Sequence, residues 1–350
     1  MDIPIKNAVP GTGGDVYVPY DERSGEESVV FFTRDLSEAG LLKIYDQVSS
    51  VLKGRIAVKL HTGEPHGPNI LPRPWVRNLF DQRLADKDAT IIETNTYYAG
   101  ERYTTPQHRK TLEVNGWIFC GVDIIDEPGT TLLPVRGGKW FDAMSVGKNL
   151  LEYDSLLTLT HFKGHVIGGF GGSNKNIGIG CADGRDGKGW IHSDTGLQDH
   201  WEIEQETLME RITESTNATL GYFGKNVCYI NVLRNMSVSC DCEGVNAMPV
   251  TVPDIGIAAS LDILAVDQTC VDLVYALPKE SSQDLVERIE TRHGLRQLSY
   301  MKEMGMGNNR YRLIDLDHDG RQITAAQAVE GISGKWVPDQ WNDSFKKITV

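Results

Sequence analysis

Hydrophobic residues along the chain alternate between short strand-like runs and longer segments with helical spacing. Runs rich in β-branched and aromatic residues predict strands, whereas apolar positions three and four residues apart predict amphipathic helices. The predicted strands are 28–33, 55–60, 89–93, 117–122, 155–160, 226–233 and 311–316, with further short apolar runs at 254–259 and 262–265. The predicted helices are 37–52, 74–85, 105–115, 202–222, 268–277 and 284–294.

This alternation predicts an α/β protein with two α/β lobes whose sheets are mostly parallel. We place the first lobe at 28–150 and the second at 151–316, with an irregular N-terminal arm at 1–27 and a C-terminal extension at 317–350. Ligands of such folds bind beyond the carboxyl ends of the strands. We therefore expect the functional site at those strand ends, between the two lobes.

Three polar motifs directly follow predicted strands. The first contributes His61 and Glu64, the second Asn95, and the third His161 and His165. Any one of these residues has a capping or supporting role about as often as a direct one. Three motifs at strand ends nevertheless predict one shared pocket.

The third motif continues into a glycine-rich segment between residues 168 and 180. Glycine costs roughly 1 kcal/mol in regular structure, so the cluster predicts a loop whose backbone approaches a ligand closely, with N–H groups forming a nest for an anion. A mobile surface loop is the alternative. The segment is not a P-loop, because Asn176 follows Lys175 where Ser or Thr is required. The candidate cofactor-binding residues are Gly169, Gly171, Gly172, Lys175, Asn176 and Asn95.

Lys175 can serve as an electrostatic clamp or, when desolvated, as a nucleophile, and otherwise is a surface lysine. His165 and the later His192 are candidate acid/base groups or metal ligands, although a lone histidine is usually structural. We take His165, Lys175, His61 and Glu64 as the candidate catalytic residues.

Cys240 and Cys242 stand in the polar stretch Ser-Cys-Asp-Cys-Glu-Gly, apart from three cysteines in apolar runs that we expect to be buried. A Cys-x-Cys pair is poorly placed to form a disulfide with itself, so we expect reduced thiols, which favour soft metals. The candidate metal ligands are His192, His161, Cys240 and Cys242, with Cys181 as a further option. The chain has no pair of Cys-x-x-Cys motifs, so it encodes no zinc ribbon or ferredoxin site.

The 350 residues carry a net charge of −13, which argues against nucleic acid or an anionic membrane as the main partner. A local basic pocket for a small-molecule substrate is compatible with this charge. No apolar stretch reaches the roughly 18–20 residues of a membrane span, and the first residues lack the pattern of a signal peptide. We expect a cytoplasmic protein that binds neither nucleic acid nor membrane. The oligomeric state is open, with a homo-oligomer as one option.

The stretch from Asp315 to Asp319 begins like the calcium loop of an EF-hand. Ala326 stands at position twelve, where that loop requires a bidentate Glu. A solvated acidic turn is therefore the preferred interpretation.

With these motifs in place, the chain resembles the family labelled uncharacterised Fe–S centre proteins, domain of unknown function 362. The resemblance covers about residues 28–316, and its matching stretches are 59–65, 94–96, 161–181, 187–192, 240–242, 252–260 and 265–268. Many members of that family carry two ferredoxin-type cysteine motifs between the part that matches His192 and the helix at 202–222. This chain has only residues 193–201 there, so ferredoxin-type clusters are not expected.

The run from His165 to Lys175 also resembles, more distantly, a run in the nickel-pincer lactate racemases. In that family the Lys carries a covalent nickel-pincer nucleotide, the His is an acid/base, and a second His near the spacing of His192 ligates nickel. Gly171 and Asn174 stand where that family has Ser and Arg, and its substrate motif is missing.

Three functions are compatible with these patterns. The first is an enzyme that uses a transition metal (nickel, iron or zinc) or a metal-pincer nucleotide to move a proton or hydride on a small polar or carboxylate substrate, as a racemase or oxidoreductase would. The second is a Cys/His metal-binding redox protein. The third is a non-catalytic protein that binds a small ligand.

Overall fold

The computed structural model describes residues 5–11, 14–194 and 203–334, and its centre is a nine-stranded sheet of order β13-β12-β1-β11-β10-β7-β2-β3-β4. β11 and β13 run antiparallel to their neighbours, and the other neighbouring strands pair in parallel. The strands are β1 Glu27–Thr33, β2 Ile56–Lys59, β3 Ala89–Glu93, β4 Val122–Ile124, β7 Ser155–His161, β10 Val227–Leu233, β11 Gly256–Ser260, β12 Arg310–Asp315 and β13 Arg321–Ile323. The α/β class with a mostly parallel sheet is confirmed.

The strands of the two expected lobes share this one sheet. β1, from the first lobe, lies between β11 and β12 of the second, and β2 pairs with β7. Two small antiparallel hairpins accompany it, β5 Thr130–Pro134 with β6 Ala143–Gly147, and β8 Lys163–His165 with β9 Gly169–Gly171.

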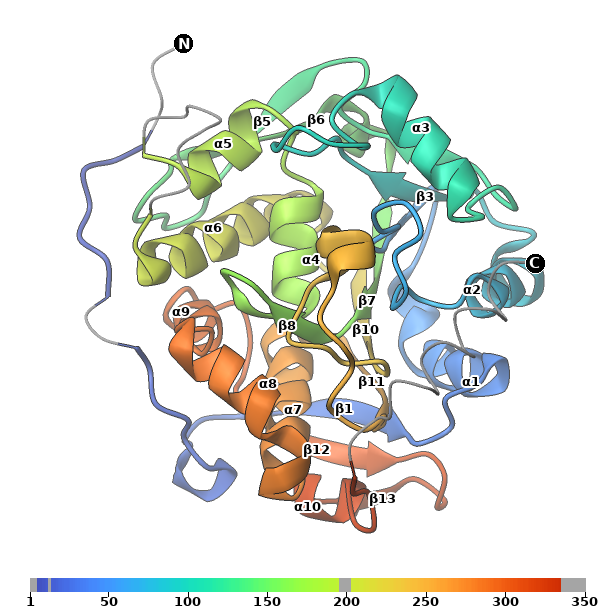
Figure 1. Cartoon of the computed structure of the whole chain (residues 1–350), viewed down its shortest axis with the longest axis vertical. Coiled ribbons are helices and arrows are strands. Elements are labelled where there is room, and N and C mark those ends of the chain that lie inside the picture. The colour runs from blue at the N-terminus through green and yellow to red at the C-terminus, as the bar shows by residue number, and fades with distance from the viewer. Residues whose placement is uncertain (1–4, 12–13, 195–202, 335–350) are drawn as a thin grey trace.

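Helices cover both faces of the sheet (Figure 1). The helices are α1 Glu38–Val48, α2 Arg73–Leu79, α3 Thr105–Val114, α4 Ser173–Gly180, α5 Asp186–His192, α6 Gln205–Phe223, α7 Ile263–Ala276, α8 Lys279–Thr291, α9 Arg296–Glu303 and α10 Ala325–Ala328. α1 and α2 share one hydrophobic core with the sheet, whereas α4, α6 and α7 share the other. Because both faces are covered, β7 and β10 are buried along their whole length. In the described part of the chain, no helix combines the length and apolar character that spanning a bilayer requires.

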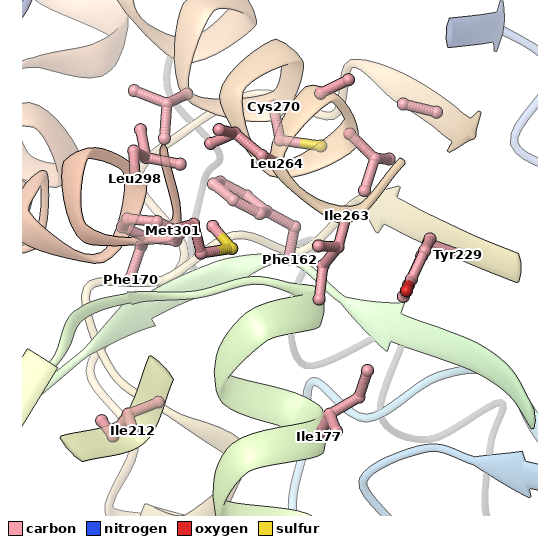
Figure 2. Close-up of a cluster of buried hydrophobic side chains, with 14 of the residues drawn as sticks. Phe162, Phe170, Ile177, Ile212, Tyr229, Ile263, Leu264, Cys270, Leu298 and Met301 are labelled. Carbon is pink, nitrogen blue, oxygen red and sulfur yellow. The ribbon is translucent and has the colours of Figure 1, made fainter. Parts of the chain in front are cut away.

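The core on the α7 side brings together segments that are far apart in sequence. Figure 2 shows Phe162, which directly precedes β8, and Phe170 of β9 close to Leu264 of α7 and to Leu298 and Met301 of α9. Their packing fixes the hairpin, and the hairpin in turn positions His165 and the start of α4.

The prediction of a loop over residues 168–180 is wrong, because the segment forms β9 and the helix α4. Close packing explains why this strand and helix contain so many glycines. A Cβ on Gly178 would lie 2.4 Å from the carbonyl oxygen of Ile212, so its absence lets α4 and α6 approach closely.

The prediction of a strand at 117–122 is also wrong, since the strand begins only at Val122. Trp117 instead packs into the core as part of a loop, where its Nε1–H donates to the carbonyl oxygen of Thr62 at 2.9 Å. The apolar run at 262–265 is the first turn of α7, and Asp262 caps that helix by accepting from the backbone N–H of Ala265 at 2.9 Å.

Candidate functional site

A cavity of about 270 Å³ lies at the carboxyl ends of β2, β3 and β7. It brings together six residues singled out from the sequence, which are His61, His165, Lys175, Asn176, His192 and Cys242. Side chains that the sequence did not single out also line it, namely Lys59, Glu93, Arg102 and Lys188. The strand ends collect these groups because neighbouring parallel strands finish at the same edge of the sheet.

His165 presents a nitrogen that carries a proton. Its Nδ1 accepts the backbone N–H of Gly168 at 2.9 Å, so a neutral ring must hold its hydrogen on Nε2. Burial and the nearby Lys175 charge lower the pKa of His165 to about 4, which keeps the ring neutral at neutral pH. Nε2 lies 3.9 Å from the sulfur of Cys242.

His192 has the opposite arrangement. Its Nδ1 lies 2.8 Å from the carbonyl oxygen of Lys188, one turn earlier in α5. A carbonyl only accepts, so Nδ1 carries the hydrogen and Nε2 holds the lone pair. Burial lowers the pKa of His192 to about 3, and the ring stacks on Tyr97 with 6.1 Å between centroids.

His61 resembles His165. Its Nδ1 accepts the backbone N–H of Gly63 at 2.9 Å, which leaves the hydrogen on Nε2. Burial lowers the pKa of His61, and its side chain hydrogen-bonds Cys240. Two imidazoles therefore present N–H groups to the Cys-x-Cys segment.

A hydrogen bond joins the side chains of Cys240 and Cys242. A hydrogen bond from the Cys242 thiol holds the pKa of Cys240 well below its ordinary value despite burial, helped by the Lys175 ammonium at 3.9 Å. The same hydrogen bond raises the pKa of Cys242. Cys240 is the N-cap residue of the short helix η5 (Asp241–Asn246), and its backbone N–H donates to the Glu243 carboxylate at 2.8 Å. Cys242 lines the cavity, and Cys240 lies buried behind it.

His161 does not lie on the cavity wall. Its Nδ1 is 2.9 Å from Asp241 and its Nε2 is 2.7 Å from the carbonyl oxygen of Arg234, so both ring nitrogens face acceptors and offer no lone pair to a metal. Lys163 pairs with the same carboxylate at 2.9 Å. Burial alone would raise the pKa of Asp241, but His161 and Lys163 hold it well below its usual range. This network fixes the turn that carries the two cysteines.

Glu64 also lies off the wall and acts on residues that line it. Its carboxylate accepts from Arg102 Nε at 2.8 Å and from the hydroxyl of Tyr98 at 2.5 Å. Glu93, at the end of β3, pairs with Lys59 at 2.8 Å and accepts from the backbone and hydroxyl of Thr62. Burial alone would raise the pKa of Glu93, but Lys59 and His61 hold it well below its usual range.

Lys188 is the most informative residue that the sequence did not reveal. Its ammonium donates to the hydroxyl of Thr94 at 2.6 Å and to the carbonyl oxygen of Asn95. Burial lowers the pKa of Lys188 to about 8. A lysine between two glycines, one helical turn before His192, was the available signal.

The backbone nest expected in the glycine-rich segment is filled by a protein side chain. The N–H groups of Ser173 and Asn174 donate to the two oxygens of Asp267 at 2.7 and 2.9 Å. A Cβ on Gly172 would lie 2.5 Å from that carboxylate, and one on Gly169 would lie 2.7 Å from Gly294. These glycines serve internal packing, whereas Gly171 makes only ordinary contacts.

The two candidate asparagines differ in position. Asn176 lines the cavity and donates to the hydroxyl of Thr160 at 2.9 Å. Asn95 donates to the hydroxyl of Thr105 at 3.0 Å, and its side-chain oxygen lies 3.4 Å from Nδ1 of His108. Its carbonyl oxygen, rather than its side chain, contacts the site through Lys188.

One group of described side chains has the spacing of metal ligands. The donor atoms of His165, Cys240 and Cys242 all lie within 4.8 Å of one another. Cys181 is elsewhere, in a hydrophobic core where burial raises its pKa to about 12. His192 lines the same cavity without belonging to this group.

The acidic turn between β12 and β13 uses its carboxylates within the protein. Asp315 lies 2.8 Å from Nδ1 of His318, and Asp317 accepts from the hydroxyl of Thr33 at 2.6 Å and from Lys43 at 2.9 Å. These contacts agree with an acidic turn whose charges are balanced locally.

The fold and the site define an α/β protein with a titratable cavity at the carboxyl edge of one large, mostly parallel sheet. Within that class, the chain belongs to the family described as Domain of unknown function (DUF362), whose model matches residues 56–272, more than half of the chain. No curated protein matches it.

Two solved structures show a distant likeness. The lactate racemase apoprotein from Thermoanaerobacterium thermosaccharolyticum has a TM-score of 0.36 and 11% identity, covering 88% of this chain and 87% of that chain. A structural-genomics protein from Thermotoga maritima has a TM-score of 0.35 and 14% identity, covering 57% of this chain and 51% of that chain. At these values neither likeness carries an inference about activity.

Proposed function

We propose that this protein is an enzyme that transfers a proton on a small polar substrate held in the cavity. The observation that carries the proposal is the contrast between two histidines of one wall. His192 holds a lone pair on Nε2, and His165 holds a hydrogen there. Acid–base catalysis needs one group of each kind within reach of the same substrate.

The surrounding residues suit this chemistry. In the proposed reaction His192 takes the proton from the substrate, the Nε2–H of neutral His165 donates a hydrogen bond to the substrate atom on which negative charge develops, and the Lys175 ammonium stabilises that charge. His61 offers a second N–H, and Glu64 acts indirectly by holding Arg102. A bound anion would raise the low pKa of His192 towards neutrality, because nearby negative charge favours imidazolium, and this would make His192 a stronger base.

The described residues do not fit a nickel-pincer nucleotide on Lys175. The cavity of about 270 Å³ is smaller than the roughly 300–1,000 Å³ typical of pockets for drug-sized ligands. The backbone N–H groups of Ser173 and Asn174, which would suit a phosphate, already donate hydrogen bonds to the Asp267 carboxylate. No step of the proposed reaction uses this cofactor.

The test is exchange of carbon-bound hydrogen in heavy water, followed by NMR over a panel of 2-hydroxy, 2-oxo and 2-amino acids. In His192→Asn the amide can still donate to the Lys188 carbonyl, and in His165→Asn the amide oxygen can still accept from Gly168, so each variant removes mainly Nε2. We expect exchange by the wild type and a loss of about a hundredfold or more in both variants.

The matched control is His66→Asn, since His66 is exposed, lies off the cavity wall, and has a φ of 58° that asparagine tolerates. This variant should exchange at the wild-type rate. Undiminished exchange in both cavity variants, or no exchange by the wild type across the panel, would contradict the proposal.

A second candidate function is binding of a soft metal by His165, Cys240 and Cys242, favoured by their spacing. It requires His165 to move its hydrogen from Nε2, which the Gly168 N–H opposes. We expect equilibrium dialysis with zinc under anaerobic conditions to show about one tightly held ion if the site exists. Binding should then be lost in Cys240→Ser and Cys242→Ser but kept in Cys120→Ser. Equal retention by all three variants would remove this candidate.

A further inference from the structure

The described residues include four buried lysines, and only two of them pair with a carboxylate there. Lys59 pairs with Glu93 at 2.8 Å, and Lys163 pairs with Asp241 at 2.9 Å. Lys175 and Lys188 form no ion pair with a carboxylate in the described part of the chain, and both line the cavity.

A buried ammonium without a counter-charge is costly, so proteins pair such groups or neutralise them. Lys175 has an ionisable partner inside the protein, because its nitrogen lies 3.9 Å from the sulfur of Cys240. Lys175 therefore does not depend on a ligand for such a partner.

Lys188 has no ionisable partner in direct contact among the described residues. Its ammonium has three N–H donors, and its hydrogen-bond partners are neutral oxygens of Thr94 and Asn95. The two carboxylates that act on it through space, Asp126 and Glu93, lie beyond the 4 Å of a direct ion pair. Asp126 accepts from the backbone N–H groups of Asn95 at 3.1 Å and Gly184 at 2.9 Å, and Glu93 is bound to Lys59. The position of a directly paired negative charge beside Lys188 is therefore left to the cavity.

We infer that the cavity binds a small organic monocarboxylate and that Lys188 is its counter-ion. This inference names the substrate class of the enzyme proposed above and rests on that proposal for the chemistry, though not for the binding. One lysine without a direct ion pair suits one carboxylate.

The other residues that line the cavity indicate what the non-carboxylate part of the ligand should be. Val166, Ile167 and Ile179 make part of the lining apolar, which suits a short carbon chain better than an inorganic anion. Glu93 is the only acidic residue that lines the cavity in the described part of the chain, and Lys59 and Thr62 already occupy it. An α-ammonium group would find no carboxylate partner, so hydroxy and oxo acids should bind better than amino acids.

The test measures binding rather than turnover, by calorimetric titration of the full chain. The probes are 2-hydroxybutyrate, 2-aminobutyrate, butanamide and inorganic phosphate. We expect the wild type to bind 2-hydroxybutyrate and to bind the other three at least about tenfold more weakly. Equal binding of butanamide or of phosphate would overturn the inference.

The matching variants remove the charge in two ways. Lys188→Met removes every donor, whereas Lys188→Gln keeps an amide N–H for Thr94 or Asn95, and the exposed Lys225→Met is the control. We expect about tenfold or greater loss of 2-hydroxybutyrate affinity in both Lys188 variants and none in the control. Wild-type affinity in the folded Lys188→Gln protein would overturn the inference.

The two proposals fail separately. Carboxylate binding that depends on Lys188 without any hydrogen exchange would support this inference and leave a ligand-binding protein rather than an enzyme. If the protein instead catalyses hydrogen exchange on an uncharged compound, and Lys188→Gln does so at the wild-type rate, the proposal of an enzyme is supported and the inference of a carboxylate ligand is overturned.

Discussion

His165 and His192 line the same cavity with their protons on opposite nitrogens. The Nδ1 of His165 accepts a backbone N–H at 2.9 Å, and the Nδ1 of His192 faces a backbone carbonyl at 2.8 Å. The two rings are kept distinct by backbone groups, so a change of side chains elsewhere in the cavity leaves the difference in place. In the proposed reaction this contrast places a hydrogen-bond donor and a base beside the same substrate.

The first prediction concerns the pH dependence of stability. The pKa of His165 is about 4 in the folded protein and about 6.5 in an unfolded chain, so folding favours the neutral ring. The stability from this group is present above about pH 6.5 and is lost as the pH falls towards 4. His165→Asn should therefore lose less unfolding free energy than the wild type over this range, measured by urea denaturation. His66→Asn should show the same pH dependence of unfolding free energy as the wild type. If His165→Asn also shows the wild-type dependence, the low pKa of His165 is refuted.

The second prediction concerns the thiolate. Because Cys240 has a lowered pKa, the native protein should show thiolate ultraviolet absorbance at neutral pH that Cys240→Ser lacks. The background is low, since burial raises the pKa of Cys120 and of Cys181 to about 12. Lys175→Met should shift the titration to higher pH by removing the ammonium at 3.9 Å. Identical spectra for the wild type and Cys240→Ser would show that the residue is a thiol.

The third prediction compares two neighbouring glycines. Gly172→Ala places a Cβ 2.5 Å from the Asp267 carboxylate that holds the first turn of α4, whereas Gly171→Ala meets only an ordinary contact at 3.5 Å. We expect Gly172→Ala to lower the unfolding free energy by about 1–3 kcal/mol, as overpacking in a core does, and Gly171→Ala to change it by less. Equal effects in urea denaturation would mean that α4 does not begin against Asp267.

The fourth prediction concerns the buried ion pair at the strand ends. Glu93→Gln leaves Lys59 without its partner and should cost about 3–5 kcal/mol at neutral pH. The folded pKa of Glu93 lies below its unfolded value, so its stabilisation is present above about pH 4.3 and is lost as the pH falls below it. The difference in unfolding free energy between Glu93→Gln and the wild type, measured by urea denaturation, should therefore become smaller at acidic pH.

The double variant Lys59→Met/Glu93→Gln is the control for that experiment, because it removes both charges. It should be more stable than Glu93→Gln alone if the cost comes from the unpaired lysine. A double variant that is less stable would assign the cost to the hydrogen bonds with Thr62 instead.

Much of the fold could be predicted because strand and helix periodicity is a local property. The predicted strand at 89–93 is β3, and the predicted helix at 37–52 contains α1, whose N-cap is Ser37. The errors arose where packing overrides propensity. The glycines of 168–180 form a hairpin and a helix, and the aromatic run from Trp117 forms a buried loop.

The candidate site could be predicted in part. His61, His165, Lys175 and His192 reach one cavity, as expected for residues placed after parallel strands. Glu64, His161 and Asn95 satisfied the same rule but bind other protein groups. Nothing in strand periodicity distinguishes these two outcomes, because each depends on a partner from another element.

By itself, the sequence determined the α/β class, the positions of most elements and the edge of the sheet where chemistry collects, because hydrophobic spacing and strand ends are encoded locally. Only the tertiary structure decided the charge balance of the cavity. Lys59 and Lys163 meet carboxylates that the chain brings from Glu93 and Asp241, while Lys188 meets none in the described residues. Electrostatic pairing depends on distance in space, and only the folded chain sets that distance.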